Sequence, residues 1–478
     1  MHIESPTRRE VCLAILLLVS LLFVSRSRPD FDLPTSVQTG SSDKQASQNS
    51  SNVEQAAAPQ PLRDRIRWGA GEIPQTKILA HVPGWSIFDK LYLLNGTLYL
   101  VSDEPSKIPA RSLMISTGIP IENGPIEQAK QVPTDREMQI ISRRDAKALF
   151  GLDAELIEGV SWLVNDDRQF VTHYYHWSAE LFFGFWRAYS SLDPSITSEG
   201  NTTLPSPRRM IFIHIDADHW RDYALMNQWV LRSSFPSIGL EFSADWSERA
   251  ETGRLFVFDR VVLADRSAAM HGFNYLRTQR TASEPFALPG SVNWWSTIRS
   301  NVIQASGLRG DIGQGTTSNP VITYVSRQEW GRRMLVQKDH EQLVAELYKL
   351  RDNYGYEVNV VSMDKLSRKE QFQLSARTTI MMGVHGNGLT SLVWMKPSPR
   401  STVMEFFYPE GFAHDYEYTS RALGMVHYGF WNDKYFTSPD VPPVNYPKGF
   451  QGNEIPIDGA AVARLCLERL TLSEEADD

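Results

Sequence analysis

The C-terminal half of the chain alternates short apolar segments with segments of helical periodicity, and this alternation limits the possible folds more than any other feature. Segments of strand composition occur at residues 321–327, 356–363, 378–384 and 402–407. Between the first two, residues 339–351 repeat leucine at the spacing of one helix face. Ser367 and Glu370 predict a capping box ahead of the next helix. Strands that alternate with helices predict a parallel sheet of the kind found in nucleotide-binding half-domains.

The part of the chain before residue 306 also has the pattern of an α/β protein. We expect strands at residues 209–216 and 254–265 and a helix at residues 223–233. A chain of 478 residues with 42% hydrophobic residues is long enough for two hydrophobic cores. We therefore predict two domains, at residues 76–305 and 306–478.

The N-terminus carries an apolar run, residues 11–24, with arginines on both sides. Arginines stand where a cleaved signal peptide needs small residues, so we predict an uncleaved signal anchor over residues 1–28, with cleavage as the alternative. Arginines before the run predict a cytosolic N-terminus and a luminal body. A short run suits thin membranes, which predicts a single-pass type II protein of the Golgi or endoplasmic reticulum. Residues 29–75 are rich in Ser, Gln and Ala and predict a flexible stem.

Three further features bear on the compartment and the partners. Acceptor patterns for N-glycosylation at Asn49, Asn95 and Asn201 agree with a luminal body. Cys12 and Cys466 leave no pair for a disulfide within the body of the chain. The 48 Lys and Arg against 56 Asp and Glu give a net charge of −8, which excludes a general attraction to nucleic acid.

The stretch "MMGVHGNGLTSLVWMKP" places glycines and a histidine after a predicted strand. His385, Gly386, Asn387 and Gly388 then lie at the carboxyl end of a parallel strand, and Leu389 lies in the first turn of the following helix. Ligands bind in such a crevice, because unpaired N–H groups face an anion and glycine lets a phosphate approach the backbone. The alternative is an ordinary glycine-rich turn with a hydrogen-bonded histidine.

At these residues the chain resembles glycosyltransferase family 61. "GVHGNGLTSLVWMKP" is similar to the family's "HGAGLTN" signature, with Asn387 and Ser391 in place of the commonest Ala and Asn. "HWSAELFFGFWR" from His176, "YVSRQEWGRRML" from Tyr324, "VMEFFYP" and the segment from Tyr418 resemble further family motifs in the same order. The resemblance covers roughly residues 160–430.

The resemblance implies a GT-B fold, in which two Rossmann-like domains face each other across a cleft. It also implies an inverting glycosyltransferase that moves a sugar from a UDP-sugar to a glycan or glycoprotein. Xylose is favoured, and N-acetylglucosamine or arabinose are possible. No cofactor is then required, because arginines replace a metal at the diphosphate.

The resemblance and the residue types assign the donor side of the site. Guanidinium groups match phosphate oxygens in a bidentate way, so Arg327, Arg332 and Arg333 are candidates to hold the diphosphate. The glycine-rich loop would contribute the donor-binding residues His385, Gly386, Asn387, Gly388, Leu389 and Thr390. Glu405, at the end of a strand, is a candidate for the ribose hydroxyls.

The transfer needs a base for the acceptor hydroxyl. His176 and Glu180 are four residues apart and share one face of a helix. Apolar surroundings would raise the pKa of the carboxyl. We therefore predict Glu180 as the base, with His176 orienting it or contacting the acceptor.

Three alternatives stay open at this point. Asp216 and Asp218 form a D-x-D pattern that could hold Mn²⁺ against the donor diphosphate. A metallohydrolase could use His173, His176, His214 and His219, although their spacings match no strong zinc pattern. A catalytically silent glycan-binding scaffold is the third.

Overall fold

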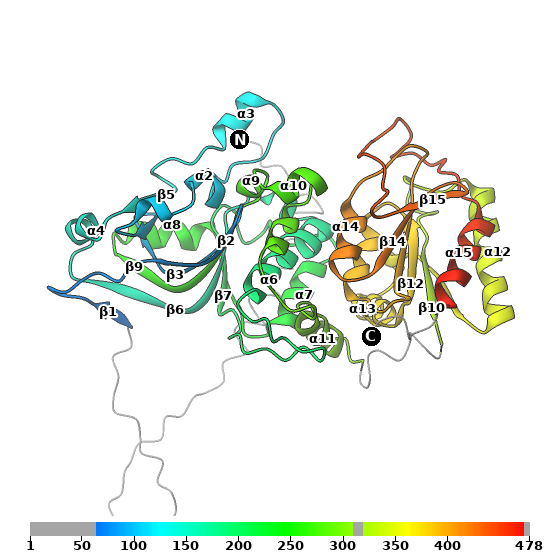
Figure 1. The fold of residues 1–478 in the computed structure, drawn as a ribbon, viewed down its shortest axis with the longest axis horizontal. Helices are drawn as coiled ribbons and strands as arrows, with labels where there is room; N and C mark the ends of the chain where they lie inside the picture. Colours follow the sequence, from blue (N-terminus) through cyan, green and yellow to red (C-terminus); the bar gives the residue numbers. More distant parts are fainter. Residues whose placement is uncertain (1–63, 309–318, 473–478) are drawn as a thin grey trace, which may run out of the picture. The chain divides into compact units, whose positions relative to one another are not determined.

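The computed structural model describes residues 64–308 and 319–472, and Figure 1 shows that these residues contain two β-sheets with helices packed around them. All of them belong to one compact unit, Pro61–Asp478. The mixed α/β class expected from the sequence is confirmed. The boundary between residues 305 and 306 stays a prediction.

The first sheet is built from the strands β1 Arg65–Arg67, β2 Lys77–Val82, β3 Trp85–Leu94, β4 Thr97–Val101, β5 Met138–Ile141, β6 Asp153–Val164, β7 Arg209–Phe212, β8 Gly239–Glu241 and β9 Phe256–Ala264. Within the described residues it has nine strands in the order β5-β4-β3-β9-β6-β7-β8, with β1 paired to β6 and β2 to β3. The two strands expected before residue 306 correspond to β7 and β9. The segment expected at residues 254–265 forms a single strand, β9.

The N-terminal boundary of the folded body differs from the expected one. The stem predicted over residues 29–75 includes β1, which pairs antiparallel with β6. Trp68 and Ile73 are buried. Residues from Arg65 onward therefore belong to the folded body, because the apolar side chains within this polar segment reach the core.

The second sheet consists of β10 Val321–Val325, β11 Glu357–Val361, β12 Ile380–Val384, β13 Thr402–Phe406, β14 Val426–Trp431 and β15 Lys434–Thr437. Its order is β11-β10-β12-β13-β14-β15, and the pairs from β11 to β14 are parallel. The four strands expected in this half are confirmed. So is the capping box, because Ser367 Oγ accepts from the N–H of Glu370 at 3.3 Å and Glu370 Oε2 accepts from the N–H of Ser367 at 2.8 Å.

The order of these strands creates a place where a ligand can bind. From β10 the chain passes through α12, Gln337–Tyr354, to β11 on one side, and then through α13, Arg368–Arg377, to β12 on the other side of β10. The loops that follow β10 and β12 therefore lead away from each other. Open parallel sheets bind ligands in the crevice that such a divergence leaves at the carboxyl ends of the strands.

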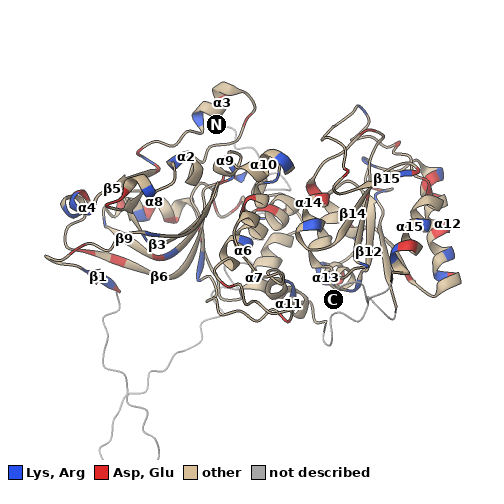
Figure 2. Cartoon of the chain, in the orientation of Figure 1, with Lys and Arg blue, Asp and Glu red and all other residues tan. Residues whose placement is uncertain are grey.

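The remaining helices join and cover the two sheets. They are η1 Pro105–Lys107, α2 Arg111–Met114, α3 Pro125–Lys130, α4 Arg143–Phe150, α5 Arg168–Val171, η2 His176–Leu181, α6 Phe182–Ser190, α7 Met226–Ser234, α8 Ser243–Glu251, α9 Arg266–Ala269, α10 Phe273–Thr278, η3 Thr281–Ala287, α11 Ser296–Ala305, η5 Met363–Lys365, η6 Asn387–Trp394, α14 Asp415–Ala422 and α15 Gly459–Leu470. Figure 2 shows acidic and basic residues mixed along surface helices such as α12.

An aromatic core fixes the segment that begins at His176. This segment starts as the π-helix η2 and continues as α6, in which every residue is buried. Phe185 of α6 stacks on Trp162 of β6 with ring centroids 4.8 Å apart. Trp394 Nε1 of η6 donates to the hydroxyl of Tyr174 at 2.9 Å, so the same core reaches the second sheet. The segment at His176 is thereby packed against the loop that follows β12.

No helix among the described residues is long and apolar enough to cross a membrane. The predicted anchor at residues 11–24 and the glycosylation pattern at Asn49 lie outside the described residues. Asn95 and Asn201 are both exposed, so these two acceptor patterns are accessible to solvent.

Candidate functional site

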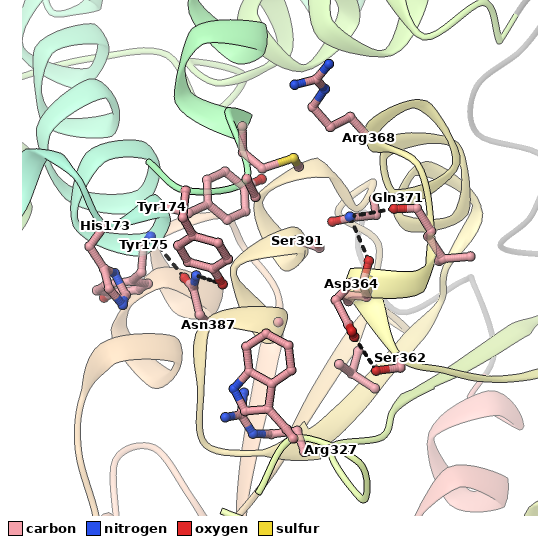
Figure 3. A pocket seen from close by; sticks show the side chains of 18 of the residues that line it. His173, Tyr174, Tyr175, Arg327, Ser362, Asp364, Arg368, Gln371, Asn387 and Ser391 are labelled. Carbon is pink, nitrogen blue, oxygen red and sulfur yellow. Dashed lines mark hydrogen bonds between the residues drawn. The ribbon is translucent and has the colours of Figure 1, made fainter. Parts of the chain in front are cut away.

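A cavity of about 910 Å³ lies at the carboxyl ends of β10, β11 and β12. Val325 and Arg327 line it from the end of β10, and His385 lines it from the end of β12. The other wall comes from the first half of the chain, at η2 and α7. Figure 3 shows that Asn387 lies next to Tyr175, which directly precedes η2. The cavity therefore occupies the crevice that the order of the strands predicts.

The three predicted donor arginines line this cavity together. Arg327 Nε is buried without a hydrogen-bond partner, and none of the ion pairs found within residues 64–308 and 319–472 involves Arg327, Arg332 or Arg333. Burial and the neighbouring charge of Arg333 lower the pKa of Arg327. Arg327 and Arg333 are half-buried and Arg332 is exposed. Cations that are partly removed from water and have no carboxylate partner are stabilised by a bound anion. This cluster is thus suited to a polyanionic group such as a diphosphate.

The glycine-rich loop lies directly against the arginines. Arg333 Nη1 donates to the carbonyl of His385 at 3.3 Å. A Cβ atom on Gly386 would lie 2.8 Å from Arg327 Nη1, and one on Gly388 would lie 2.8 Å from Val325 Cγ1. Glycine at these two positions therefore lets the loop pack against β10 and the side chain that follows it.

The predicted loop residues do not all reach the cavity. His385, Asn387 and Gly388 line it, but Gly386, Leu389 and Thr390 do not. Leu389 and Thr390 are buried in η6, a 3₁₀-helix where the sequence suggested the start of an ordinary helix. Thr390 Oγ1 donates to Asn387 Oδ1 at 3.2 Å and so helps to fix the side chain of Asn387.

Glu405 supports His385 and is not part of the cavity wall. Its carboxyl is fully buried, with Oε1 2.5 Å from His385 Nδ1 and Oε2 2.9 Å from His427 Nε2. Burial raises the pKa of Glu405 and lowers the pKa of His385 to about 3, so the pair is held in its neutral form. The expected contact of Glu405 with ribose hydroxyls is corrected accordingly, because both of its oxygens bind histidines.

His176 and Glu180 form a pair in which only the histidine faces the cavity. His176 Nδ1 is 2.5 Å from Glu180 Oε2, and His176 lines the cavity while Glu180 does not. Glu180 is 1% exposed. Arg266 Nη1 donates to Glu180 Oε2 at 3.0 Å, and Arg280 Nη1 lies 4.0 Å from Glu180 Oε1.

The pKa of Glu180 departs from its expected direction. Burial by itself raises the pKa of the carboxyl, as the sequence suggested, but the charges of Arg266 and His176 outweigh burial and lower the pKa well below its ordinary value. The helix pattern contained no sign of these arginines, which come from distant segments of the chain. Glu180 is therefore a buried, ionised partner of His176.

Asp415 is a cavity residue that the sequence pattern did not single out. It begins α14 and lines the cavity. Arg280 Nη2 lies 3.2 Å from Asp415 Oδ2. Burial opposes ionisation of Asp415, but the charge of Arg280 outweighs it and lowers the pKa. Arg280 thus connects Asp415 to Glu180, and no local motif around Asp415 could have indicated this.

Other cavity residues were also missed by the sequence reasoning. They include Tyr223, Trp330, Asp364 and Arg368. Asp364 follows the end of β11, just as the glycine-rich loop follows the end of β12. Its position after a predicted strand could therefore have indicated that it lines the cavity. Tyr223 and Trp330 lie in loops, where residue type alone carries no positional information.

Of the alternative metal residues, His173 and His176 line the cavity, whereas His214, Asp216, Asp218 and His219 do not. Asp216 accepts hydrogen bonds from the N–H groups of Asp218 and His219 and lies 2.7 Å from His219 Nδ1. His214 Nε2 is 3.0 Å from Asn165 Oδ1. Within residues 64–308 and 319–472 no group of three or more potential ligands is arranged to hold a metal ion.

Comparison with known proteins finds one family match, over part of the chain. A search of curated proteins found no match. Residues 174–404 match the family model described as Glycosyltransferase 61, and the matched segment contains His176, the arginine cluster and the glycine-rich loop. Its members are glycosyltransferases, which use a sugar donor and a glycan acceptor. The resemblance found in the sequence is thereby confirmed, and the chain carries a glycosyltransferase family 61 domain over residues 174–404.

Proposed function

We propose that this protein is an inverting glycosyltransferase of the GT-B type that transfers a sugar from a UDP-sugar to a glycan or glycoprotein. The observation that carries the proposal is the arginine cluster at the carboxyl end of β10. Arg327, Arg332 and Arg333 line a cavity large enough for a nucleotide sugar and have no carboxylate partner among the described residues. A diphosphate supplies the negative charge that this cluster lacks.

The acceptor proton goes to His176 in this proposal. The acceptor oxygen attacks C1 of the sugar from the face opposite the diphosphate and transfers its proton to His176 Nε2. The bond between C1 and the diphosphate oxygen breaks, and its electron pair stays on the departing UDP. Glu180 orients the ring through Nδ1 and stabilises the imidazolium that forms, as the carboxylate does in a Ser-His-Asp triad.

The leaving group is stabilised without a metal ion in this proposal. Positive charge that is already in position lowers the energy of the charge that develops on the departing phosphate. The arginines supply this charge, so Mn²⁺ at Asp216 and Asp218 is the less favoured alternative. A catalytically silent scaffold would bind glycan without releasing UDP.

The donor sugar and the compartment belong to the same proposal. We favour xylose, which lacks the C6 hydroxymethyl group, so that a pocket closed at that position would accept it and exclude N-acetylglucosamine sterically. Arabinose stays possible. We place the body in the lumen of the Golgi or endoplasmic reticulum, on the basis of the apolar run at residues 11–24 and its flanking arginines.

The test is a panel of UDP-sugars added to the full chain, with UDP release as the readout. We expect release with one donor and an acceptor glycan, and UDP binding that persists in EDTA. Loss of both binding and turnover in EDTA would favour the metal-dependent alternative. Binding of glycan with no UDP release from any donor would favour the silent scaffold.

A further inference from the structure

The loop between β7 and α7 presents an exposed tyrosine to the cavity. Tyr223 lines the cavity, and 71% of its surface is accessible. It comes from the half of the chain opposite the arginine cluster. A large, exposed aromatic side chain on the wall of a substrate cavity is suited to contacting a ligand.

The backbone around Tyr223 is fixed by buried polar groups. Asp222 and Asn227 are 1% and 0% exposed. Asp222 Oδ1 accepts from the N–H of Asn227 at 3.0 Å, and Asn227 Oδ1 accepts from the N–H of Asp222 at 3.2 Å. Leu225, which follows closely, has φ +56°, a conformation that non-glycine residues adopt rarely. Among the described residues, seven non-glycine positions have positive φ, and of these Arg333 also lines the cavity.

The hydroxyl of Tyr223 has its own proton available. Asn387 Nδ2 donates to Tyr223 Oη at 3.3 Å, so the tyrosine is the acceptor in this contact. Asn387 Oδ1 accepts from the N–H of Tyr175 at 3.2 Å, which orients its NH₂ group toward Tyr223. The phenol can therefore donate its hydrogen to a ligand.

The position of this hydroxyl identifies the part of the ligand that it contacts. Tyr223 is hydrogen-bonded to the glycine-rich loop through Asn387, and it lines the same cavity as Arg327, whose pKa it affects. The loop and Arg327 are the groups assigned above to the diphosphate. Tyr223 therefore approaches the same anion from the opposite wall.

We propose that Tyr223 is a catalytic residue that donates a hydrogen bond to the oxygen of the departing diphosphate. This inference rests on the proposed function and adds a residue from the other half of the chain. While the bond to C1 breaks and its electron pair moves to the phosphate oxygen, the phenol keeps its proton and its hydrogen bond strengthens. A donor that acts on developing charge raises kcat more than it lowers KM.

The proposed hydrogen bond predicts a difference in affinity between UDP, UMP and the UDP-sugar that the arginines alone would not cause. In a UDP-sugar the leaving oxygen is esterified, whereas in UDP it carries charge. UMP lacks the β-phosphate. Removal of the hydroxyl should therefore weaken binding of UDP, leave binding of UMP unchanged and have little effect on KM for the UDP-sugar.

The experiment compares Tyr223→Phe with wild type in the full chain. We expect kcat for UDP release to fall about a hundredfold to a thousandfold, as for the loss of one donor to a developing anion. The ratio of UDP to UMP affinity, measured by calorimetry, should fall as well. Tyr435→Phe is the matched control, because Tyr435 is exposed on β15 and does not line the cavity. An unchanged kcat and an unchanged affinity ratio in Tyr223→Phe, with an active wild type, would overturn the inference.

Two further variants separate other roles of the side chain. If Tyr223 only holds Asn387, the double variant Tyr223→Phe/Asn387→Ala will be no worse than Asn387→Ala, and this result would overturn the inference. If Tyr223→Phe is normal and Tyr223→Ala is inactive, the ring packs on the sugar and the hydroxyl has no role. Absence of UDP binding and turnover in wild type would instead refute the proposed function itself.

Discussion

His176 Nδ1 lies 2.5 Å from Glu180 Oε2, and this contact links a side chain on the cavity wall to a carboxylate that is 1% exposed. The histidine can exchange a proton with a substrate, whereas the carboxylate can act only through the histidine. In the proposed function the roles are therefore the reverse of those that the helix spacing suggested.

Replacement of His176 by alanine should abolish most of the turnover and leave UDP binding intact. The base acts on the acceptor, and His176 is not part of the arginine cluster. Turnover should fall by a factor of about a hundred to ten thousand. UDP release and calorimetry on the same preparation measure the two effects. Near-normal turnover in folded His176→Ala would assign the base elsewhere, with Asp415 as the next cavity residue to test.

Glu180→Gln should lower the free energy of unfolding as well as the rate of turnover. Arg266 is buried and donates to Glu180 at 3.0 Å, so loss of the carboxylate leaves a buried guanidinium without this partner. Breaking such a pair costs about 3–5 kcal/mol. Urea unfolding measures this loss. Arg266→Met should have a similar effect, and the double variant should lose much less than the two losses added together.

Arg327→Ala should weaken UDP binding at least about tenfold, because a hydrogen bond to a charged group contributes about 1.5–3 kcal/mol. Arg327→Lys keeps the charge but cannot bind two phosphate oxygens at once, so we expect an intermediate affinity. Arg351→Ala is a suitable control, since Arg351 lies on α12 and pairs with Asp352. Equal UDP affinity in all three variants would place the diphosphate away from β10.

His385→Ala and Glu405→Gln should differ in their effect on UDP binding. His385 lines the cavity, so its removal should weaken UDP binding. Glu405 is held neutral by burial, and glutamine keeps its size and its ability to hydrogen-bond to both histidines. UDP affinity by calorimetry should therefore change little in Glu405→Gln. A large loss in that variant, with an unchanged melting temperature, would indicate a direct contact between Glu405 and the nucleotide.

The stability of the protein should depend on the titration of His427. Burial lowers the pKa of this histidine from 6.5 to about 4, so between these values the unfolded chain binds more protons than the folded one. The free energy of unfolding should then fall as pH decreases from about 6.5 to about 4, by up to about 3 kcal/mol from this group. Glu405, with its raised pKa, acts in the opposite sense. Urea unfolding at several pH values should show a shallower loss in His427→Gln than in wild type.

Local patterns in the sequence determined much of the second sheet. Leucine spacing predicted α12, and Ser367 with Glu370 predicted the start of α13, because both signals act within one or two helical turns. The strands are buried and short, and they read as continuous apolar segments. Their alternation with helices predicted the crevice, and three residues predicted from the glycine-rich loop after β12, His385, Asn387 and Gly388, reach it.

The first sheet was predicted only in part. Its pairs include β1 with β6 and β3 with β9, which are far apart along the chain. Pairing at such a distance is decided by packing and register, and neither is visible in a local window. The tertiary structure alone therefore decided where the folded body begins.

The same distinction separates the residues of the site. Residue type and position identified Arg327, His385 and His176, because each follows or begins a predicted element. The ionised state of Glu180 depends on Arg266 and Arg280, which lie 86 and 100 residues further along the chain. Electrostatic interactions act through space between groups that folding brings together. The sequence thus determined which titratable groups are available, and the tertiary structure decided which of them faces the cavity and which is buried beside an arginine.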